Sequence, residues 1–135
     1  MIAASPLPCD DRRPTPQRLA VLAAFEEMGR PLAVGEVLEL GRRVVPRLGI
    51  ATVYRHLREL VDGGQLTLVS LPGGVVRYEL AGLAGHHHFQ CSRCDRVYDI
   101  HGAILGVEQL LPKLFRLERQ ELILHGRCAD CEADA

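Results

Sequence analysis

Apolar residues recur with a helical period in three stretches of the first half of the chain. The first stretch begins at Thr15-Pro16, since Thr favours the N-cap and Pro the first helical position, and it ends at Gly29. The second runs from about Ala33 to Val44, and the third from Ile50 or Ala51 to Gly63-Gly64. The predicted inner faces are Leu19, Leu22, Ala23 and Phe25; Val34, Val37, Leu38 and Gly41; and Ile50, Val53, Leu57, Leu60 and Val61.

After Gly64 the period changes from helical to two, which predicts a hairpin. Leu66, Leu68 and Ser70 alternate with Thr67 and Val69. The turn Pro72-Gly73-Gly74 follows, and 75–80 forms the return strand. Three short helices and a hairpin make a winged helix-turn-helix, whose third helix would enter a DNA major groove. The outward arc of that helix carries Ala51, Thr52, Tyr54, Arg55, Arg58 and Glu59.

The segment 81–85 is small and uncharged, and we interpret it as a hinge between domains 14–80 and 86–135. Residues 1–13 are expected to be a disordered tail. Beyond the hinge, strands are predicted at His86–Cys91, Val97–Ile100 and Glu121–His125, with an amphipathic helix over Ile104–Leu117. Its core candidates are Leu105, Leu110, Leu111 and Leu114, with a kink at Pro112. The exposed strand edges of such an α/β unit favour pairing with a second copy.

Two cysteine pairs, Cys91/Cys94 and Cys128/Cys131, each have two residues between the sulfurs, and 33 residues separate the pairs. Four thiolates match the tetrahedral shell of a structural zinc. Two disulfides or buried thiols are the alternatives, and Cys9 receives no role. The predicted fold class is α+β: an N-terminal winged helix-turn-helix followed by a small α/β dimerisation domain with a four-cysteine zinc site.

Composition and charge narrow the class of protein. The 135 residues, 47% of them hydrophobic, suit one domain or two small ones. The apolar runs are too short to cross a membrane, and the N-terminus lacks a signal peptide. We therefore expect a cytoplasmic protein with reduced thiols, which disfavours disulfides.

The net charge of −1 conceals a basic segment with five arginines and no carboxylate between Gly41 and Arg58. Such a basic segment is either a nucleic-acid-binding surface or an ordinary solvent-exposed face. The predicted winged helix favours DNA contact for Arg55 and Arg58.

Taken in order, these motifs resemble the ferric uptake regulator (Fur) family. The resemblance rests on Ala51-Thr52-Val53-Tyr54-Arg55, the Pro-Gly-Gly wing, Tyr78-Glu79-Leu80, the histidine-rich strand and the cysteine pairs. It implies a dimeric, metal-responsive DNA-binding repressor, because members sense iron, zinc, manganese, nickel or peroxide. Double-stranded operator DNA and a second copy of the chain are the expected partners. The implied DNA-binding residues are Thr15, Arg18, Ala51, Thr52, Tyr54, Arg55 and Arg58.

The resemblance also implies a regulatory metal site at the hinge, formed by Glu79, His86 and His88. Residues two apart on a strand share a side, so His86 and His88 can hold one ion, Zn²⁺ or Fe²⁺. Where the family often supplies a further histidine, this chain has Leu32. Asp99, His101 or water would then complete the site, and Asp99 matches an acidic ligand of peroxide-sensing members.

A third site of the family involves the position of His87, which points away from the hinge pair. Its other positions correspond to Gly106 and Gln120, and Glu108 or His125 would substitute only with a register shift. His87 is therefore a candidate ligand for a third site whose other family positions carry no ligand in this chain.

Binding of the hinge ion is expected to close the dimer on two half-sites of operator DNA. One alternative is a peroxide sensor that uses iron at the same site. A more remote one is a zinc hydrolase, although the deaminase H-x-E…P-C-x-x-C order and the H-E-x-x-H helix are both absent.

Overall fold

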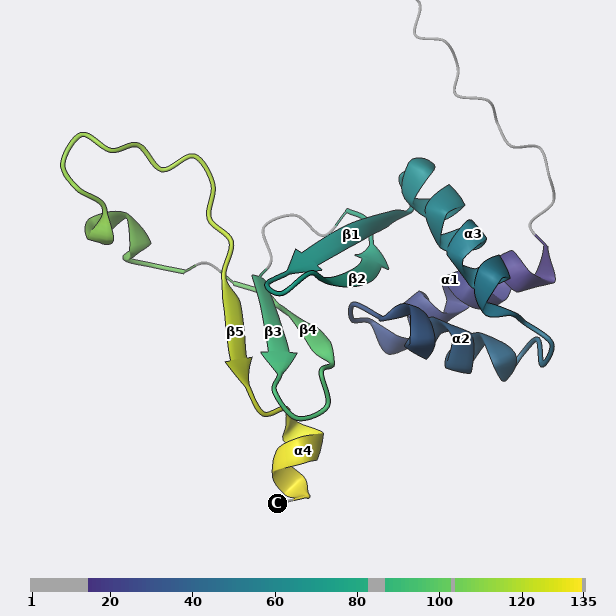
Figure 1. Ribbon diagram of the computed structural model, residues 1–135. Helices are drawn as coiled ribbons and strands as arrows, with labels where there is room; N and C mark the ends of the chain where they lie inside the picture. The colour runs from purple at the N-terminus through teal and green to yellow at the C-terminus, as the bar shows by residue number, and fades with distance from the viewer. Residues whose placement is uncertain (1–14, 83–86, 103, 135) are drawn as a thin grey trace, which may run out of the picture.

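The computed structural model describes residues 15–82, 87–102 and 104–134. Three helices are followed by a two-stranded hairpin and then by a three-stranded sheet with a short C-terminal helix (Figure 1). The elements are α1 (Pro16–Met28), α2 (Val34–Arg42), α3 (Ile50–Asp62), β1 (Leu66–Leu71), β2 (Val75–Leu80), β3 (His87–Cys91), β4 (Val97–Ile100), the 3₁₀ helix η1 (Val107–Leu110), β5 (Ile123–Gly126) and α4 (Ala129–Ala133). The predicted fold class, a winged helix followed by a small domain containing a sheet, is confirmed.

The ends of α1 follow the sequence signals. The Thr15 hydroxyl accepts a hydrogen bond from the Arg18 backbone N–H at 3.2 Å, and Pro16 occupies the first turn. Gly29 adopts a left-handed conformation with φ 60° and donates its N–H to the Phe25 carbonyl, which ends the helix.

One aliphatic core joins the three helices to the base of the hairpin. Its buried members are Val21, Ala24, Phe25, Leu32, Val37, Leu48, Val53, Leu57, Leu60 and Leu66. Three sequence-based core assignments are wrong, because Leu19, Ala23 and Ile50 are exposed. The buried face of α1 is rotated toward Ala20 and Val21, where α2 and α3 cover it.

Both faces of the hairpin are used, which the simple alternation did not predict. β1 and β2 pair antiparallel from Leu66↔Leu80 to Leu71↔Val75, and Leu32 adds a bridge to Tyr78. Leu66 packs into the helical core, whereas Val69 and Leu71 point to the other face and pack on Val97 of β4. Leu68, two residues after Leu66 on β1, is about half exposed.

The second sheet has the strand order β4-β3-β5, with β3 and β4 antiparallel and β3 and β5 parallel. Because β3 and β5 are parallel, their carboxyl ends lie at the same edge, where Cys91 pairs with Gly126. Each cysteine pair therefore follows a strand end at that edge. The last strand begins two residues later than the predicted Glu121.

The predicted helix over 104–117 is wrong. The structure has one 3₁₀ turn there, and residues 104–122 form an arm that projects from the sheet (Figure 1). Pro112 lacks an N–H and disfavours a helical Leu111, whose ψ is 144°; Leu114 has a left-handed φ of 72°. Leu105, Leu110 and Leu114, expected in a core, are exposed, whereas Leu111 is half-buried.

Some predictions lie outside the described residues: the tail 1–13, most of the hinge 81–85, and His86. Among the helices in the described ranges, none is long and apolar enough to cross a membrane.

Candidate metal centres and nucleic-acid interface

The four paired cysteines converge at the edge of the second sheet where β3 and β5 end. Cys91 is the last residue of β3, and Cys94 lies in the turn that follows. Cys128 is the N-cap residue of α4, and Cys131 lies within that helix. Their four sulfurs all lie within 4.8 Å of one another, and the Cys94 and Cys128 sulfurs are 3.8 Å apart. Zinc–sulfur bonds of about 2.3 Å in a tetrahedron separate the sulfurs by about 3.8 Å. The donor set and its spacing therefore fit zinc.

The alternative of two disulfides is not observed, since all four cysteines are free thiols. Hydrogen bonds with the backbone of Cys128 and Cys94 lower the pKa of Cys91 to about 6. Burial, together with hydrogen bonding to the other three sulfurs, raises the pKa of Cys131 to about 12. The four thiols thus differ in pKa. A bound divalent cation would favour the thiolate form of all four.

A second group of donors joins the hairpin to the second sheet. Glu79 lies on β2, and His88 and Asp99 are cross-strand partners on β3 and β4. The Nε2 atom of His88 lies 3.4 Å from Glu79 Oε2 and 3.3 Å from Asp99 Oδ1. Their side chains are 6%, 16% and 4% exposed for Glu79, His88 and Asp99.

This donor set also fits a divalent cation. Two carboxylates face one imidazole, and that imidazole carries at most one positive charge. At least one buried negative charge is therefore left without compensation, which favours a bound cation. Nitrogen and oxygen donors suit Fe²⁺, Zn²⁺ or Mn²⁺. Of the two predicted histidines His88 is in the group, and His86 lies outside the described residues. Asp99, a candidate from sequence, is brought to the site, whereas His101 is not part of the described group.

The remaining histidine candidates do not assemble a third group within the described ranges. His87 is buried on the opposite side of β3, where its Nδ1 accepts a hydrogen bond from Leu122 N–H at 3.2 Å. It therefore anchors the start of β5. Leu32 is fully buried in the helical core, so no ligand replaces the family's additional histidine at that position.

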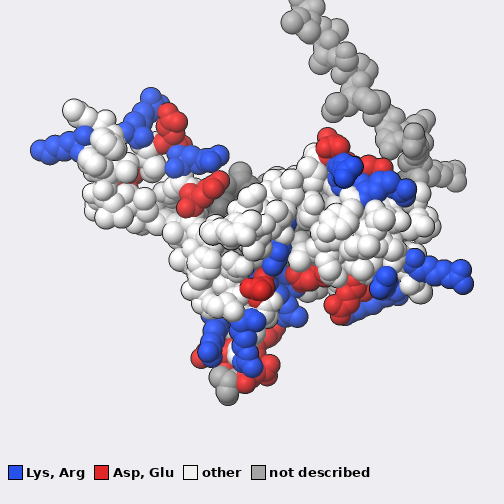
Figure 2. All heavy atoms as spheres, in the orientation of Figure 1, with Lys and Arg blue, Asp and Glu red and all other residues white. Residues whose placement is uncertain are grey.

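The outer face of α3 has the features of a nucleic-acid interface. Tyr54, Arg55 and Arg58 are exposed, and Ala51 and Thr52 lie in the same turns. Figure 2 shows basic side chains protruding from the helical end of the molecule, with carboxylates among them. Arg18 pairs with Glu59 at 3.7 Å, while Thr15 serves as the helix cap.

Sequence reasoning assigned no role to Arg30, Arg77 or Tyr98, and isolated residues of these types carry no motif. The structure places all three at the boundary between the helical half and the second sheet. It also buries His56 within α3, although the pattern placed no histidine in the core.

Comparisons with known proteins agree on one family. The profile described as "Ferric uptake regulator family" matches residues 10–125. The ferric uptake regulation protein of Bacillus subtilis (strain 168) is 34% identical over 124 residues, covering 87% of this chain and 83% of that protein. The peroxide operon regulator of the same organism is 28% identical over 123 residues, covering 88% and 83%.

Solved structures show the same fold. A zinc-bound manganese uptake regulator superposes with a TM-score of 0.74 at 24% identity, covering 87% of this chain and 91% of that one. A zinc uptake regulator complexed with zinc and DNA gives a TM-score of 0.54 at 28% identity, covering 93% and 87%.

Proposed function

The chain belongs to the ferric uptake regulator family, and on that premise we propose that it is a metal-dependent repressor whose hinge ion controls operator binding. The family's proteins are transcriptional regulators rather than enzymes, so the alternative of a zinc hydrolase is set aside. A second, structural zinc is held by Cys91, Cys94, Cys128 and Cys131.

The observation that carries the proposal is the meeting of Glu79 with His88 and Asp99. Glu79 belongs to the return strand of the wing, whereas His88 and Asp99 belong to the second sheet. An ion bound by all three, together with His86, would tie the DNA-binding half to the other half of the chain. It would then favour one relative orientation of the two halves. By linkage, operator DNA would tighten the same metal site.

Zinc or iron is the proposed regulatory ion. A mixed nitrogen and oxygen set discriminates poorly among divalent metals, so availability in the cell contributes to the choice. Solved structures described as ferric, manganese and zinc uptake regulators share the fold.

The proposed DNA interface is the N-terminal and outer face of α3, which would enter the major groove. Its members are Thr15, Arg18, Ala51, Thr52, Tyr54, Arg55 and Arg58. Exposure of Tyr54, Arg55 and Arg58 supports this assignment. In a two-fold dimer, the recognition helices would reach half-sites about 34 Å apart.

Residues 86–135 are the proposed dimerisation domain, 14–80 the DNA-binding domain and 81–85 the hinge. The exposed Leu110, Leu114 and Phe115 of the arm, with Leu124 on the edge strand β5, support a homodimer. Apolar side chains at such exposures are typical of interaction sites. A repressor of chromosomal DNA would act in the cytoplasm, as the sequence predicts.

Peroxide sensing is the second candidate, and Asp99 favours it, because a second carboxylate joins the hinge group. A relative is also named a peroxide operon regulator. Iron and peroxide would then oxidise a histidine ligand and release DNA. Mass spectrometry should find one added oxygen on His86 or His88 after such treatment; an unmodified protein that keeps binding DNA argues for metal sensing alone.

The test of the main proposal combines metal analysis with DNA-binding anisotropy on genomic fragments. About one zinc per chain should resist a mild chelator. A second, removable ion should restore DNA binding, and Glu79→Ala or His88→Ala should abolish that restoration. His125→Ala, which changes an exposed histidine on β5, is the matched control. DNA binding that ignores added metal, with only the tight zinc present, would refute regulatory control by the hinge site.

A further inference from the structure

A second set of contacts, separate from the hinge donors, connects the helical half with the first cysteine knuckle (residues 91–95). Part of it is apolar: Val69 and Leu71 of β1 pack on Val97 of β4, which is fully buried. Val97 follows the knuckle closely in the chain. The hairpin therefore rests on the strand that leaves the zinc-ligand turn.

A hydrogen bond reaches the knuckle itself. The Arg77 Nη2 on β2 donates to the backbone carbonyl of Asp95 at 3.1 Å. Asp95 has a left-handed φ of 63°, and its N–H donates to the Cys91 carbonyl at 3.0 Å. The carbonyl that Arg77 uses is therefore positioned by the closed turn, whose shape the metal would fix.

A third contact joins the helical half to β4, the strand that follows the knuckle. The guanidinium of Arg30 lies 5.6 Å from the centroid of the Tyr98 ring, within cation–π range. Arg30 is 8% exposed and is held by Glu36 and the Pro31 carbonyl.

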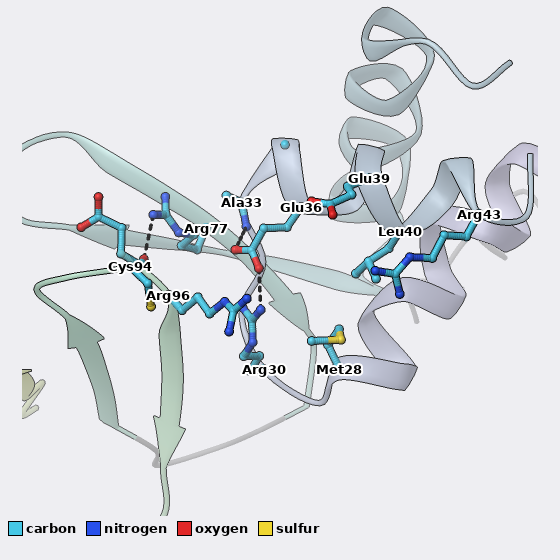
Figure 3. Close-up of a pocket in the computed structure, with 12 residues that line it drawn as sticks. Met28, Arg30, Ala33, Glu36, Glu39, Leu40, Arg43, Arg77, Cys94 and Arg96 are labelled. Carbon is cyan, nitrogen blue, oxygen red and sulfur yellow. Dashed lines mark hydrogen bonds and ion pairs between the residues drawn. The ribbon is translucent and has the colours of Figure 1, made fainter. Parts of the chain in front are cut away.

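Elsewhere along this boundary the two halves are separated. A cavity of about 460 Å³ lies between α2 and the knuckle, with Met28, Glu39 and Arg43 on one wall and Cys94 and Arg96 on the other (Figure 3). Figure 3 shows Arg96 extending across it toward Arg30 and Glu36. Beside this cavity, the described contacts that cross the boundary are made by individual side chains, among them Arg30 and Arg77.

We propose that Arg30 and Arg77 are positioning residues that dock the winged helix on the four-cysteine metal site. The structural zinc site then biases the orientation of the DNA-binding half before the hinge ion binds, and the hinge ion completes that orientation. The inference rests on the proposed function, because its consequence is a DNA-binding geometry that is partly formed without the regulatory metal. In this scheme the hinge ion completes a preformed arrangement.

The experiment uses two pairs of variants in the full, zinc-loaded chain. Arg77→Ala removes the hydrogen bond to Asp95, and Arg43→Ala removes the same charge from the cavity wall without breaking a described contact across the boundary. Tyr98→Leu removes the ring under Arg30, whereas Tyr98→Phe keeps the ring. Zinc content is measured for every variant.

The first readout is small-angle X-ray scattering with the hinge ion removed by a mild chelator. Arg77→Ala and Tyr98→Leu should have a larger radius of gyration than the wild type, and Arg43→Ala and Tyr98→Phe should match it. The second readout is DNA affinity at saturating hinge metal. It should fall about fivefold in the two docking variants, the loss expected from one net hydrogen bond or cation–π contact.

Equal scattering and equal DNA affinity for Arg77→Ala and Arg43→Ala would overturn the proposal. If Tyr98→Leu loses zinc, the Arg77 pair decides alone, because Arg77 contacts no cysteine sulfur in the described structure. A wild-type protein that binds no DNA would refute the proposed function, while the scattering readout would still test the docking.

Discussion

His88 and Asp99 face each other across β3 and β4, with the imidazole Nε2 3.3 Å from the carboxylate Oδ1. This pairing fixes two donors of the hinge group on one rigid sheet. Only Glu79 then arrives from the other half of the chain. The strand register, rather than a loop, therefore sets most of the candidate regulatory site.

Replacing Asp99 should weaken hinge-metal binding. Asp99→Ala removes one oxygen donor and is expected to lower the affinity at least about 10- to 100-fold, the loss that follows when a group that only supports a metal ligand is removed. Competition with a fluorescent chelator measures this affinity. His125→Ala should leave it unchanged, and an unaltered affinity in Asp99→Ala would exclude the carboxylate from the site.

Zinc binding to the four cysteines should release protons and strengthen as the pH rises. Burial raises the pKa of Cys94 and that of Cys131, the latter to about 12, so both are thiols at neutral pH without metal. Calorimetry in buffers of different ionisation enthalpy should count about two or more protons released per zinc. Release of less than one proton would contradict this protonation pattern.

The Cys91 thiol should make the stability of the metal-free protein depend on pH in the same direction. Backbone hydrogen bonds lower its pKa from 9.0 to about 6, so its contribution to folding is complete above pH 9 and disappears as the pH falls through 6. Urea unfolding of chelated protein between these pH values should show stability decreasing on acidification, and Cys91→Ser should reduce that slope.

Arg55 and Arg58 should contribute to DNA binding mainly through phosphate or base contacts. If each neutralises one phosphate, each Ala substitution reduces the slope of log affinity against log salt by about one. Anisotropy titrations over a series of salt concentrations measure this slope. Arg116→Ala, an exposed arginine on the arm, serves as the charge-matched control and should leave the slope unaltered.

The helix cap at Thr15 can be separated from its proposed DNA contact. Thr15→Ala should cost about 1 kcal/mol of folding free energy, because it leaves the Arg18 N–H without its side-chain acceptor. Thr15→Asp keeps an acceptor but adds a negative charge, so it should retain stability and weaken DNA binding. Chemical denaturation and anisotropy give the two values, and equal DNA binding by Thr15→Asp would exclude Thr15 from the interface.

The arm leucines should act in self-association rather than in folding. Leu114→Ser should raise the dimer dissociation constant measured by sedimentation while leaving the melting temperature of the helical half unchanged, because the side chain is fully exposed. Leu19→Ser, on the exposed face of α1, is the matched control and should not affect association.

The sequence predicted most of the helical half because its signals are local. The Thr15 cap, the left-handed Gly29 and the Pro-Gly-Gly turn each specify the backbone within a few residues. The four-cysteine cluster was equally predictable, since the repeated spacing is specific to metal ligation.

The arm was mispredicted because periodicity does not reveal whether a neighbouring surface exists. Leu110 and Leu114 are four residues apart, a helical spacing, but Pro112 and the left-handed Leu114 interrupt any helix, and the described chain offers these leucines no core. Asp99 and His101 lie on the same face of a strand, so the sequence alone did not show which of them would join the metal site. The strand register, which pairs Asp99 with His88, decides this. The contacts of Arg30 and Arg77 depend on how the two halves meet, which no local pattern encodes.

The parallel pairing of β3 with β5 affects the order in which the chain acquires its structure during translation. The helical core and hairpin are complete once residue 80 has left the ribosome, whereas β3 has no parallel partner until 123–126 emerge. Pairing across such a separation is slow, because a long loop must close first. Binding of zinc by Cys91 and Cys94, and then by Cys128 and Cys131, would close the loop between the two cysteine pairs. The nascent protein would therefore pass through a stage with a finished winged helix and an open segment rich in thiols, and the supply of zinc in the cell would set how long that stage lasts.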